Sequence, residues 1–281
     1  MTPLAEKSEK LKSMIRELGS ALVAFSGGVD SALVLAVARE ALGDKALAVT
    51  ARSESLPQRE LNAAGELARE LGAEHLVIET EETLSPDYLK NPVNRCYHCK
   101  SELYSKLSKL AEEKNLSYVL NGVNRDDLGD HRPGIDAAHE AGVLSPLAET
   151  GFTKQDVRDL ARQMGLPNWE KPAMACLSSR VPYGEPITAE KLSMIERAED
   201  LLLSLGFTQL RVRHHGEVAR IELPREDIPK FFTGSIPDTV ETRFKKIGFR
   251  FVTVDIEGFR SGRMNEGIIK HRHPSTSSGR Q

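Results

Sequence analysis

The segment Ala21-Leu22-Val23-Ala24-Phe25-Ser26-Gly27-Gly28-Val29-Asp30-Ser31 is the starting point for inferring the architecture of this chain. An apolar strand runs into a turn with two glycines, and a helix begins near Asp30. The glycines let backbone N–H groups approach an anion closely, and the helix directs the positive end of its dipole at the same point. The segment therefore predicts a nucleotide phosphate-binding loop. A tight turn without a ligand is the alternative.

The residues of this loop suit ATP and magnesium. The loop contains no lysine, as a Walker loop would, and it lacks the third glycine of the dinucleotide fingerprint. It resembles the SGGxDS loop of the ATP pyrophosphatases, which include NAD and GMP synthetases. The resemblance implies cleavage of ATP between its α and β phosphates, adenylation of an acceptor and release of pyrophosphate. We expect ATP to contact Ala24, Ser26, Gly27, Gly28, Val29, Asp30 and Ser31, with Asp30 holding Mg²⁺.

Strand and helix patterns alternate along the first part of the chain. Apolar strands are predicted at 21–25, 45–50, 74–79 and 118–120, and helices at 11–18, 32–38, 60–71 and 102–114. This alternation predicts an α/β domain with a doubly wound parallel sheet. Ligands of such sheets bind at the carboxyl ends of the strands, so we expect the phosphate loop, Arg52 and the loop 121–134 to converge on one crevice.

The pattern changes after Trp169, which suggests a domain boundary near residue 170. Residues 171–186 are rich in Pro and Gly and predict a linker that carries Cys176. A helix from Thr188 to Leu205 and alternating strands at 209–214, 219–223 and 250–256 then predict a second, smaller α+β domain over 187–270. The polar tail 271–281 is expected to be disordered.

Composition favours a small anionic ligand. The 281 residues are 40% hydrophobic, which suffices for two cores, and carry a net charge of −3. Residues 209–281 hold 14 Lys and Arg against 9 Asp and Glu, so the first 208 carry −8. This is a poor surface for nucleic acid, and we expect no nucleic-acid partner. No segment has a membrane-spanning length or the apolar core of a signal peptide, so we expect a cytoplasmic protein without a membrane partner.

Two further segments carry charged residues that suit nucleotide chemistry. In the loop 121–134, we expect Gly122, Asp127 and Arg132 to contact ATP, with Asp127 and Asp130 near magnesium or the ribose. A solvated turn is the alternative. Lys154 lies at the start of a predicted helix, where its positive charge is unfavourable beside the positive end of the helix dipole, so a functional role would explain its position. It matches the lysine of a KxxVR helix in the pyrophosphatases, which reaches the terminal phosphates; an ordinary exposed lysine is the alternative.

Three cysteines suggest metal or redox chemistry in a reducing compartment. Cys96 and Cys99 form a Cys-x-x-Cys pair before a predicted helix, spaced to chelate one metal or to form a redox pair. Together with Cys176 they are one thiolate short of a closed zinc site, whereas an iron–sulfur cluster on three cysteines keeps one iron open. A zinc site completed by His98 and three unrelated thiols are the alternatives.

The segments 176–184, 211–214, 220–224 and 258–265, together with the phosphate loop, resemble the LarE family. These ATP-dependent sulfurtransferases build the nickel-pincer nucleotide cofactor by converting carboxylates of pyridinium-3,5-biscarboxylic acid mononucleotide to thiocarboxylates. The resemblance implies an adenine nucleotide alpha hydrolase-like fold, a homo-oligomer, and Cys176, Asp30 and Lys154 as catalytic residues. In some members the matching cysteine gives up its sulfur and becomes dehydroalanine. In three-cysteine members Cys96, Cys99 and Cys176 would hold a [4Fe-4S] cluster that supplies sulfur.

An arginine-rich set is expected to bind the substrate mononucleotide. Two arginines spaced two apart on a strand place both guanidiniums on one face, where they can fork onto a phosphate. The predicted contacts are Ser179, Arg180, Glu199, Arg211, Arg213, Arg260 and Arg263. Alternatively, the arginines form surface ion pairs with Glu217, Glu222 and Asp255. We expect Glu199 to orient Arg180 or the pyridinium ring. A solvated helix face is the alternative.

Two other functions are compatible with the phosphate loop. An iron–sulfur-dependent tRNA thiolase would share the loop and the cysteines, but the charge distribution argues against tRNA. A ligase that uses ATP without a thiol would stay active without Cys176. Adenylation followed by sulfur transfer explains more of the residues, because a carboxylate becomes a good electrophile only when its oxygen leaves as a phosphate ester.

Overall fold

The computed structural model describes residues 2–129 and 133–260. The chain divides into two compact units, Met1–Ala175 and Cys176–Gln281, so the division falls inside the segment 171–186. Four of the predicted features lie outside the described residues: Asp130, Arg132, Arg263 and the tail 271–281. Each unit has its own sheet and core.

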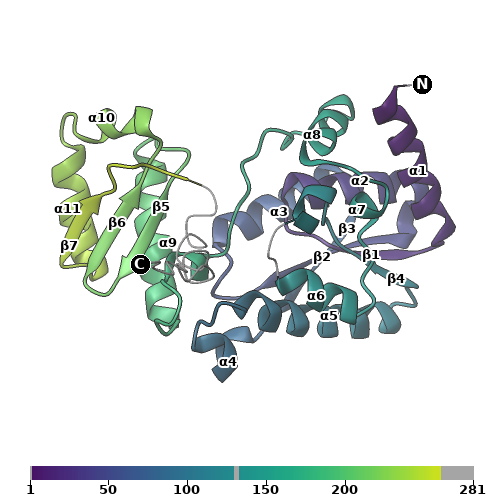
Figure 1. The fold of residues 1–281 in the computed structure, drawn as a ribbon, viewed down its shortest axis with the longest axis horizontal. Helices are drawn as coiled ribbons and strands as arrows, with labels where there is room; N and C mark the ends of the chain where they lie inside the picture. The colour runs from purple at the N-terminus through teal and green to yellow at the C-terminus, as the bar shows by residue number, and fades with distance from the viewer. Residues whose placement is uncertain (1, 130–132, 261–281) are drawn as a thin grey trace, which may run out of the picture. The chain divides into compact units, whose positions relative to one another are not determined.

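The first unit is built on a parallel four-stranded sheet (Figure 1). The strands are β1 (Ala21–Ala24), β2 (Ala46–Arg52), β3 (Glu74–Glu79) and β4 (Tyr118–Leu120), in the order β3-β2-β1-β4. The central strand β1 pairs in parallel with both β2 and β4. The predicted α/β fold is confirmed, and the near-continuous apolar sequence of β1 and β2 follows from burial on both faces of a parallel sheet.

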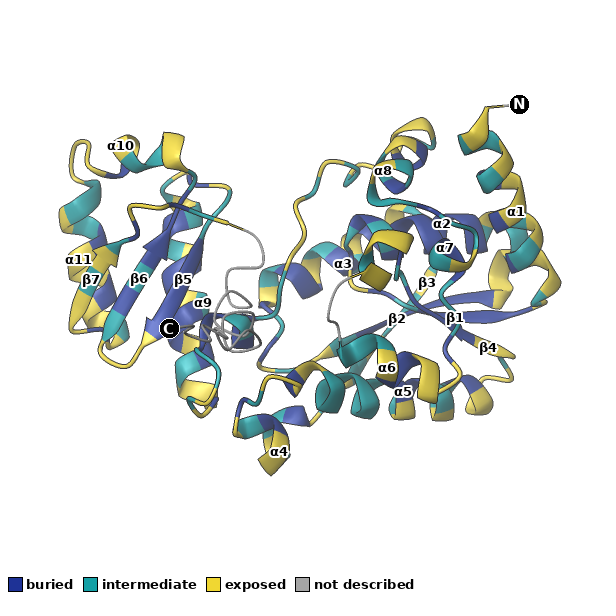
Figure 2. Ribbon diagram, in the orientation of Figure 1, coloured by how far each residue is buried: buried dark blue, intermediate teal, exposed yellow. Residues whose placement is uncertain are grey.

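Helices cover both faces of this sheet (Figure 2). Ala21 and Val23 of β1 pack into one core with α1 (Pro3–Glu17), α2 (Val29–Leu42), α3 (Gln58–Glu70) and α8 (Lys154–Gln163). Leu22 points to the opposite core, which α5 (Arg95–Glu113) and α6 (Pro133–Glu140) close. No helix within residues 2–129 and 133–260 has both the length and the hydropathy of a membrane span. Short elements complete the unit: η1 (Gly43–Lys45), η2 (Glu82–Leu84), α4 (Pro86–Leu89), η3 (Arg125–Gly129) and α7 (Pro146–Glu149).

The second unit packs helices against a small mixed sheet. Strands β5 (Arg211–His215) and β6 (Val218–Glu222) are antiparallel, and β7 (Phe251–Val254) joins β6 in parallel. The helices α9 (Ala189–Ser204) and α11 (Ile236–Ile247) bury Leu202 and Phe244 in its core. The remaining elements are η4 (Leu177–Arg180), η5 (Arg225–Asp227) and α10 (Ile228–Phe231).

Two predictions of local structure are wrong. Helix α5 begins at Arg95 rather than near Glu102, so Cys96 and Cys99 lie inside its first two turns instead of before it. Pro92 precedes the helix by three residues, and the Asn94 side chain makes no capping hydrogen bond, so the usual start signal is missing. The loop 121–134 also contains regular structure, because η3 spans Arg125–Gly129 and α6 starts at Pro133.

Candidate active site

The phosphate loop is closed by two serine hydroxyls. The Ser31 hydroxyl donates to the Gly28 carbonyl at 3.1 Å and accepts from the backbone N–H of Ser26 at 3.2 Å. Ser26 Oγ therefore donates to Ser31 Oγ at 3.1 Å. Ser31 is buried and holds the turn, whereas Ser26 is exposed at its surface. Gly28, the N-cap residue of α2, has no side chain that could cap the helix, so the first N–H groups of the helix stay available to an anion.

Two glycines allow other segments to approach this turn closely. Gly27 has a φ of 68°, the left-handed region that favours glycine. A Cβ on Gly122, in the loop after β4, would lie 2.7 Å from the backbone nitrogen of Ser31. Gly122 was predicted as an ATP contact, and the structure places its backbone against the start of α2. On the other side, Asn168 Nδ2 donates to the Gly27 carbonyl at 3.1 Å.

Asp30 and Lys154, far apart in the sequence, form an ion pair beside the loop. Lys154 Nζ lies 2.5 Å from Asp30 Oδ2, and the two side chains are 32% and 22% exposed. The capping box of Thr153 and Asp156 starts α8 at Lys154, which fixes the lysine at this helix end. Asn124 Nδ2 donates to the other oxygen, Asp30 Oδ1, at 3.0 Å. The carboxylate is a hard oxygen ligand at a phosphate loop, so its chemistry fits magnesium.

The other residues predicted to contact ATP lie at the same edge of the sheet, with different partners. Arg52 ends β2 and pairs with the carboxylate of Glu79 on β3. Asp127 Oδ2 accepts from the backbone N–H of Asn124 at 3.1 Å. Ala24 ends β1, and Val29 is buried at the start of α2.

Sequence reasoning missed two asparagines of this site. Asn124 and Asn168 bond to the phosphate loop and its helix from 94 and 141 residues away. A single asparagine carries no periodic pattern. The only signal for Asn124 was its place in the loop that follows a predicted strand.

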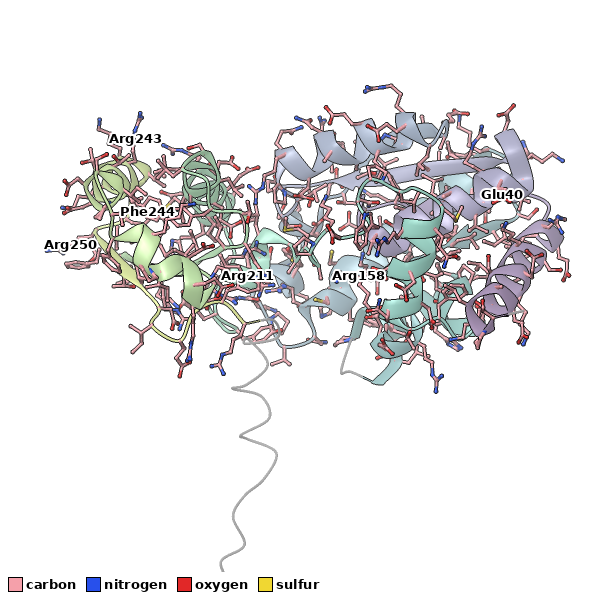
Figure 3. The ribbon with its side chains drawn as sticks, turned by 90° about the horizontal axis from the view of Figure 1, so that it is seen from above. Glu40, Arg158, Arg211, Arg243, Phe244 and Arg250 are labelled. Carbon is pink, nitrogen blue, oxygen red and sulfur yellow. The ribbon has the colours of Figure 1, made fainter. Side chains whose placement is uncertain are left out.

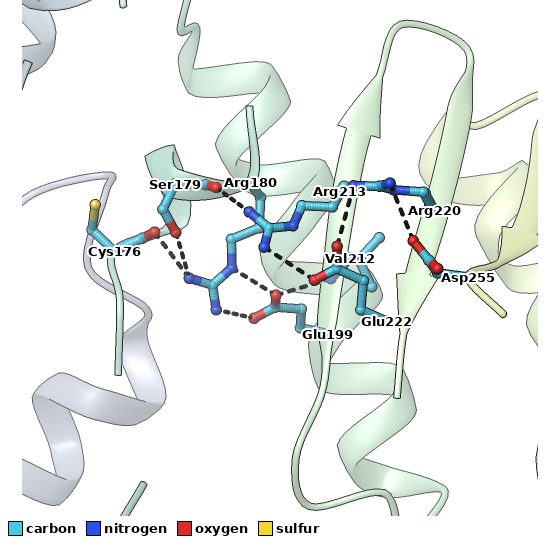
Figure 4. Close-up of polar contacts among 9 residues, drawn as sticks. All are labelled: Cys176, Ser179, Arg180, Glu199, Val212, Arg213, Arg220, Glu222 and Asp255. Carbon is cyan, nitrogen blue, oxygen red and sulfur yellow. Dashed lines mark hydrogen bonds and ion pairs between the residues drawn. The ribbon is translucent and has the colours of Figure 1, made fainter. Parts of the chain in front are cut away.

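In the second unit, Arg180 and Glu199 form a buried ion pair (Figure 4). Arg180 Nε and Nη2 donate to the two oxygens of Glu199 at 2.9 and 3.1 Å. Both side chains are 1% exposed, so the alternative of a solvated helix face for Glu199 is wrong. Arg180 Nη1 also donates to the carbonyl oxygen of Cys176 and to Ser179 Oγ, both at 3.0 Å. The pair therefore holds the backbone next to the cysteine.

Arg213 and Arg220 share a second carboxylate. Arg213 Nη2 and Arg220 Nη2 contact the two oxygens of Glu222 at 3.0 and 3.2 Å, and Arg220 Nη1 reaches Asp255 at 3.1 Å. Arg213 also donates to the Ser179 carbonyl at 2.6 Å. The alternative that Arg213 pairs with Glu222 is therefore observed, but this pair is buried rather than on the surface. Glu217 does pair on the surface, with Arg250.

Arg211 differs from its neighbours. Its side chain, labelled in Figure 3, is 8% exposed and stacks over the Phe259 ring at 4.9 Å. Within the described residues it makes no ion pair and no side-chain hydrogen bond. Burial, with the positive charges of Arg180 and Arg213, lowers the pKa of Arg211 to about 10. A buried cation of this kind is suited to an anionic ligand.

The remaining predicted residues are distributed over both units. Cys96 is exposed and Cys99 half-buried on α5, whereas half-buried Cys176 precedes η4 in the second unit. Figure 4 shows the Cys176 thiol pointing away from the arginine network. Arg260 is exposed and pairs with Glu257. Across residues 2–129 and 133–260, no three Cys, His, Asp or Glu side chains form a group that could hold a metal ion.

Comparison with known proteins relates both units to one family. The asparagine synthase family model matches residues 12–122, which contain the phosphate loop. An uncharacterised Synechocystis protein is 49% identical over 95% of this chain and 100% of its own length. The pyridinium-3,5-bisthiocarboxylic acid mononucleotide synthase of Lactiplantibacillus plantarum is 43% identical over 96% of this chain and 98% of its own. The glutamine-hydrolysing GMP synthase of Aeropyrum pernix is 30% identical over 69% of this chain and 42% of its own.

The similarity to the Lactiplantibacillus synthase covers nearly all of both chains. It therefore relates the two proteins over their whole length and not over a single domain. The matched family model and the SGGVDS loop are both consistent with cleavage of ATP at the α–β bond and adenylation of an acceptor. The chain therefore belongs to the LarE family of ATP-dependent sulfurtransferases, within the phosphate-loop ATP pyrophosphatase superfamily.

Proposed function

We propose that this enzyme converts the carboxylates of pyridinium-3,5-biscarboxylic acid mononucleotide to thiocarboxylates, for a nickel-pincer nucleotide cofactor. A substrate carboxylate attacks the α phosphorus of ATP, so an acyl adenylate forms and pyrophosphate leaves. Hydrosulfide sulfur then attacks the acyl carbon, AMP leaves, and the thiocarboxylic acid releases a proton. The family relationship supports this reaction, because the Lactiplantibacillus relative is named for the bisthiocarboxylic product.

The first unit would carry out the adenylation. The N–H groups at the start of α2 and the dipole of that helix face the loop where the phosphates would lie. Asp30 would hold Mg²⁺, and Lys154 would leave its ion pair with Asp30 to contact the terminal phosphates. That pair is partly exposed, so exchanging one partner for a phosphate or a cation costs little.

The second unit would hold the substrate, and the observation that supports this is Arg211. Its buried guanidinium has no carboxylate partner among the described residues, whereas neighbouring Arg180 and Arg213 are each bound to a glutamate. A mononucleotide phosphate would supply the missing negative charge. Arg180 and Arg213 would then act mainly by positioning Ser179 and the backbone of Cys176.

Sulfur delivery would involve the three cysteines. Thiolates are the usual ligands of iron–sulfur clusters, and Cys96 and Cys99 lie one turn apart on α5, so these two cysteines would suit a [4Fe-4S] cluster by residue type and spacing, with Cys176 as the proposed third ligand. When bound, that cluster would supply the sulfur that attacks the adenylate. The alternative, in which Cys176 gives up its own sulfur, predicts a dehydroalanine at this position. A homo-oligomer and a cytoplasmic location stay predictions.

A pair of variants tests the proposal. In Arg211→Met, we expect the affinity for the mononucleotide, measured by calorimetry, to fall about 10- to 100-fold, because a hydrogen-bonded charge is lost. Arg250→Met, which removes an exposed arginine of the same unit, is the control. Unchanged affinity in Arg211→Met would show that the phosphate binds elsewhere.

A third variant tests the sulfur step. Cys176→Ala should still release pyrophosphate but form no thiocarboxylate, as measured by mass spectrometry of the product. Full thiocarboxylate formation by this variant would refute sulfur transfer through Cys176. Intact-protein mass after turnover distinguishes the two routes, since only the sacrificial route removes the elements of hydrogen sulfide from the wild-type chain.

A further inference from the structure

Asn124 lies in the loop after β4 and is 2% exposed. Its side chain links this loop to the start of α2. Nδ2 donates to Asp30 Oδ1 at 3.0 Å, and Oδ1 accepts from the backbone N–H of Asp126 at 2.9 Å. A carboxylate only accepts and a backbone N–H only donates, so these two partners fix which way the amide faces.

The backbone around Asn124 is held as firmly as its side chain. The N–H of Asn124 donates to Asp127 Oδ2 at 3.1 Å, and the next N–H, of Arg125, donates to the Phe152 carbonyl at 2.8 Å. Asp126 Oδ2 accepts from the backbone N–H of Lys154 at 2.8 Å. The loop that carries Asn124 is therefore anchored to the start of α8, so the backbone of Asn124 is held in place relative to the backbone of Lys154.

Asp30 is bound from both sides in this arrangement, by Asn124 on Oδ1 and by Lys154 on Oδ2. The two partners differ in what ATP does to them. A lysine that reaches the terminal phosphates gives up its contact with Asp30, whereas a neutral amide has no reason to leave the carboxylate. After ATP binds, Asn124 is the contact that still orients Asp30.

We propose that Asn124 is a positioning residue: it holds Oδ1 of Asp30 and so orients the carboxylate that would hold the magnesium ion of MgATP. This inference rests on the ATP chemistry of the proposed function and is independent of its sulfur step. Groups that orient a metal-binding carboxylate typically change metal affinity by roughly 10- to 100-fold when removed. Asn124 would thus set the affinity for the metal rather than the affinity for the nucleotide.

Binding of Mn²⁺ in place of Mg²⁺, followed by electron paramagnetic resonance with a non-hydrolysable ATP analogue, tests the proposal in the full-length protein. In Asn124→Ala, we expect Mn²⁺ affinity to fall roughly 10- to 100-fold, with analogue affinity in the absence of metal changed less than about threefold. Asn62→Ala on α3, whose partner Gln58 is also exposed, is the matched control.

The Asp30→Asn background separates positioning from a general loss of structure. If Asn124 acts through Asp30, adding Asn124→Ala to Asp30→Asn changes Mn²⁺ affinity little further, so the two effects are not additive. Additive losses, or wild-type Mn²⁺ affinity in Asn124→Ala, would overturn the proposal. Failure of the proposed function has a different signature: the wild-type protein would release no pyrophosphate with the mononucleotide, while its Mn²⁺ binding still reports on Asn124.

Discussion

The two units use ion pairs in opposite ways. In the first, Lys154 and Asp30 meet beside the phosphate loop and stay partly open to solvent. In the second, Arg180 and Glu199 are enclosed and bidentate, and Glu199 also accepts from the backbone N–H of Val212. An exposed pair is weak and can exchange partners, whereas a buried pair resists separation because a lone buried charge is costly. The Lys154–Asp30 pair can therefore exchange partners, whereas the Arg180–Glu199 pair fixes structure.

Breaking the buried pair should give the largest effect. We expect Glu199→Ala to lower the free energy of unfolding of the second unit by about 3–5 kcal/mol, because Arg180 is left buried without a partner. Hydrogen exchange of α9 and β5 would measure the loss. The double variant Arg180→Met with Glu199→Leu removes both charges and should recover most of the stability. A cost below about 1 kcal/mol for Glu199→Ala would show that the pair is not the structural element inferred here.

Breaking the partly exposed pair should affect catalysis and leave stability nearly unchanged. Lys154→Met is expected to slow pyrophosphate release about 10²- to 10³-fold, as the loss of one donor to developing charge does. Its free energy of unfolding should change by less than about 1 kcal/mol. Lys12→Met removes the comparable Lys12–Glu40 pair of the same unit and should leave the rate unchanged. Stopped-flow detection of pyrophosphate measures the rate, and urea titration measures the stability. A large loss of stability in Lys154→Met would show that the partly exposed pair is structural, like the buried one.

The close approach of the loop after β4 to α2 predicts a smaller effect. Gly122→Ala would place a methyl group 2.7 Å from the Ser31 nitrogen, and relieving this contact should cost about 1–3 kcal/mol of stability. Because the contact lies at the start of α2, ATP affinity should fall as well. Gly129→Ala in the adjacent η3 meets no atom of residues 2–129 and 133–260 within 4 Å and should be nearly neutral. If urea titrations showed the same stability for Gly122→Ala and Gly129→Ala, the loop after β4 would be able to move away from α2 at no cost.

The smallest effect concerns pH. Burial lowers the pKa of His214 in the second unit, where the ring packs against Phe249. Its neutral form stabilises the fold fully above the unfolded pKa of about 6.5, and this contribution is lost as the pH falls through the lower folded pKa. The second unit should therefore lose stability in acid, as followed by hydrogen exchange between pH 7 and 5. His214→Leu should make the stability of the second unit depend less on pH. An unchanged pH dependence would show that other groups cause it.

The sequence predicted the sheet of the first unit better than its polar contacts. β3 and β4 were predicted with the bounds that the structure shows, because each is a short apolar run between polar residues, although the edge strand β3 is largely open to solvent. The start of α5 was missed because no side chain caps it, and α11 lay in a segment without a predicted element. Lys154 was singled out because it opposes a helix dipole and matches the KxxVR lysine, and the structure shows it paired with Asp30. The partners of Arg180 and Arg213 stayed open, since ion pairing between distant segments depends on the tertiary fold.

The contact between Asn168 and the Gly27 carbonyl has a practical consequence. Asn168 is followed by Trp169, the only tryptophan of the chain, which packs against the Arg162 guanidinium at 5.0 Å. Intrinsic fluorescence excited at the indole band therefore comes from one position, adjacent in sequence to the group that holds the phosphate loop. A nucleotide that shifts Gly27 would shift Asn168 and alter the surroundings of the indole. We therefore expect the fluorescence of Trp169 to change when a nucleotide binds at the phosphate loop.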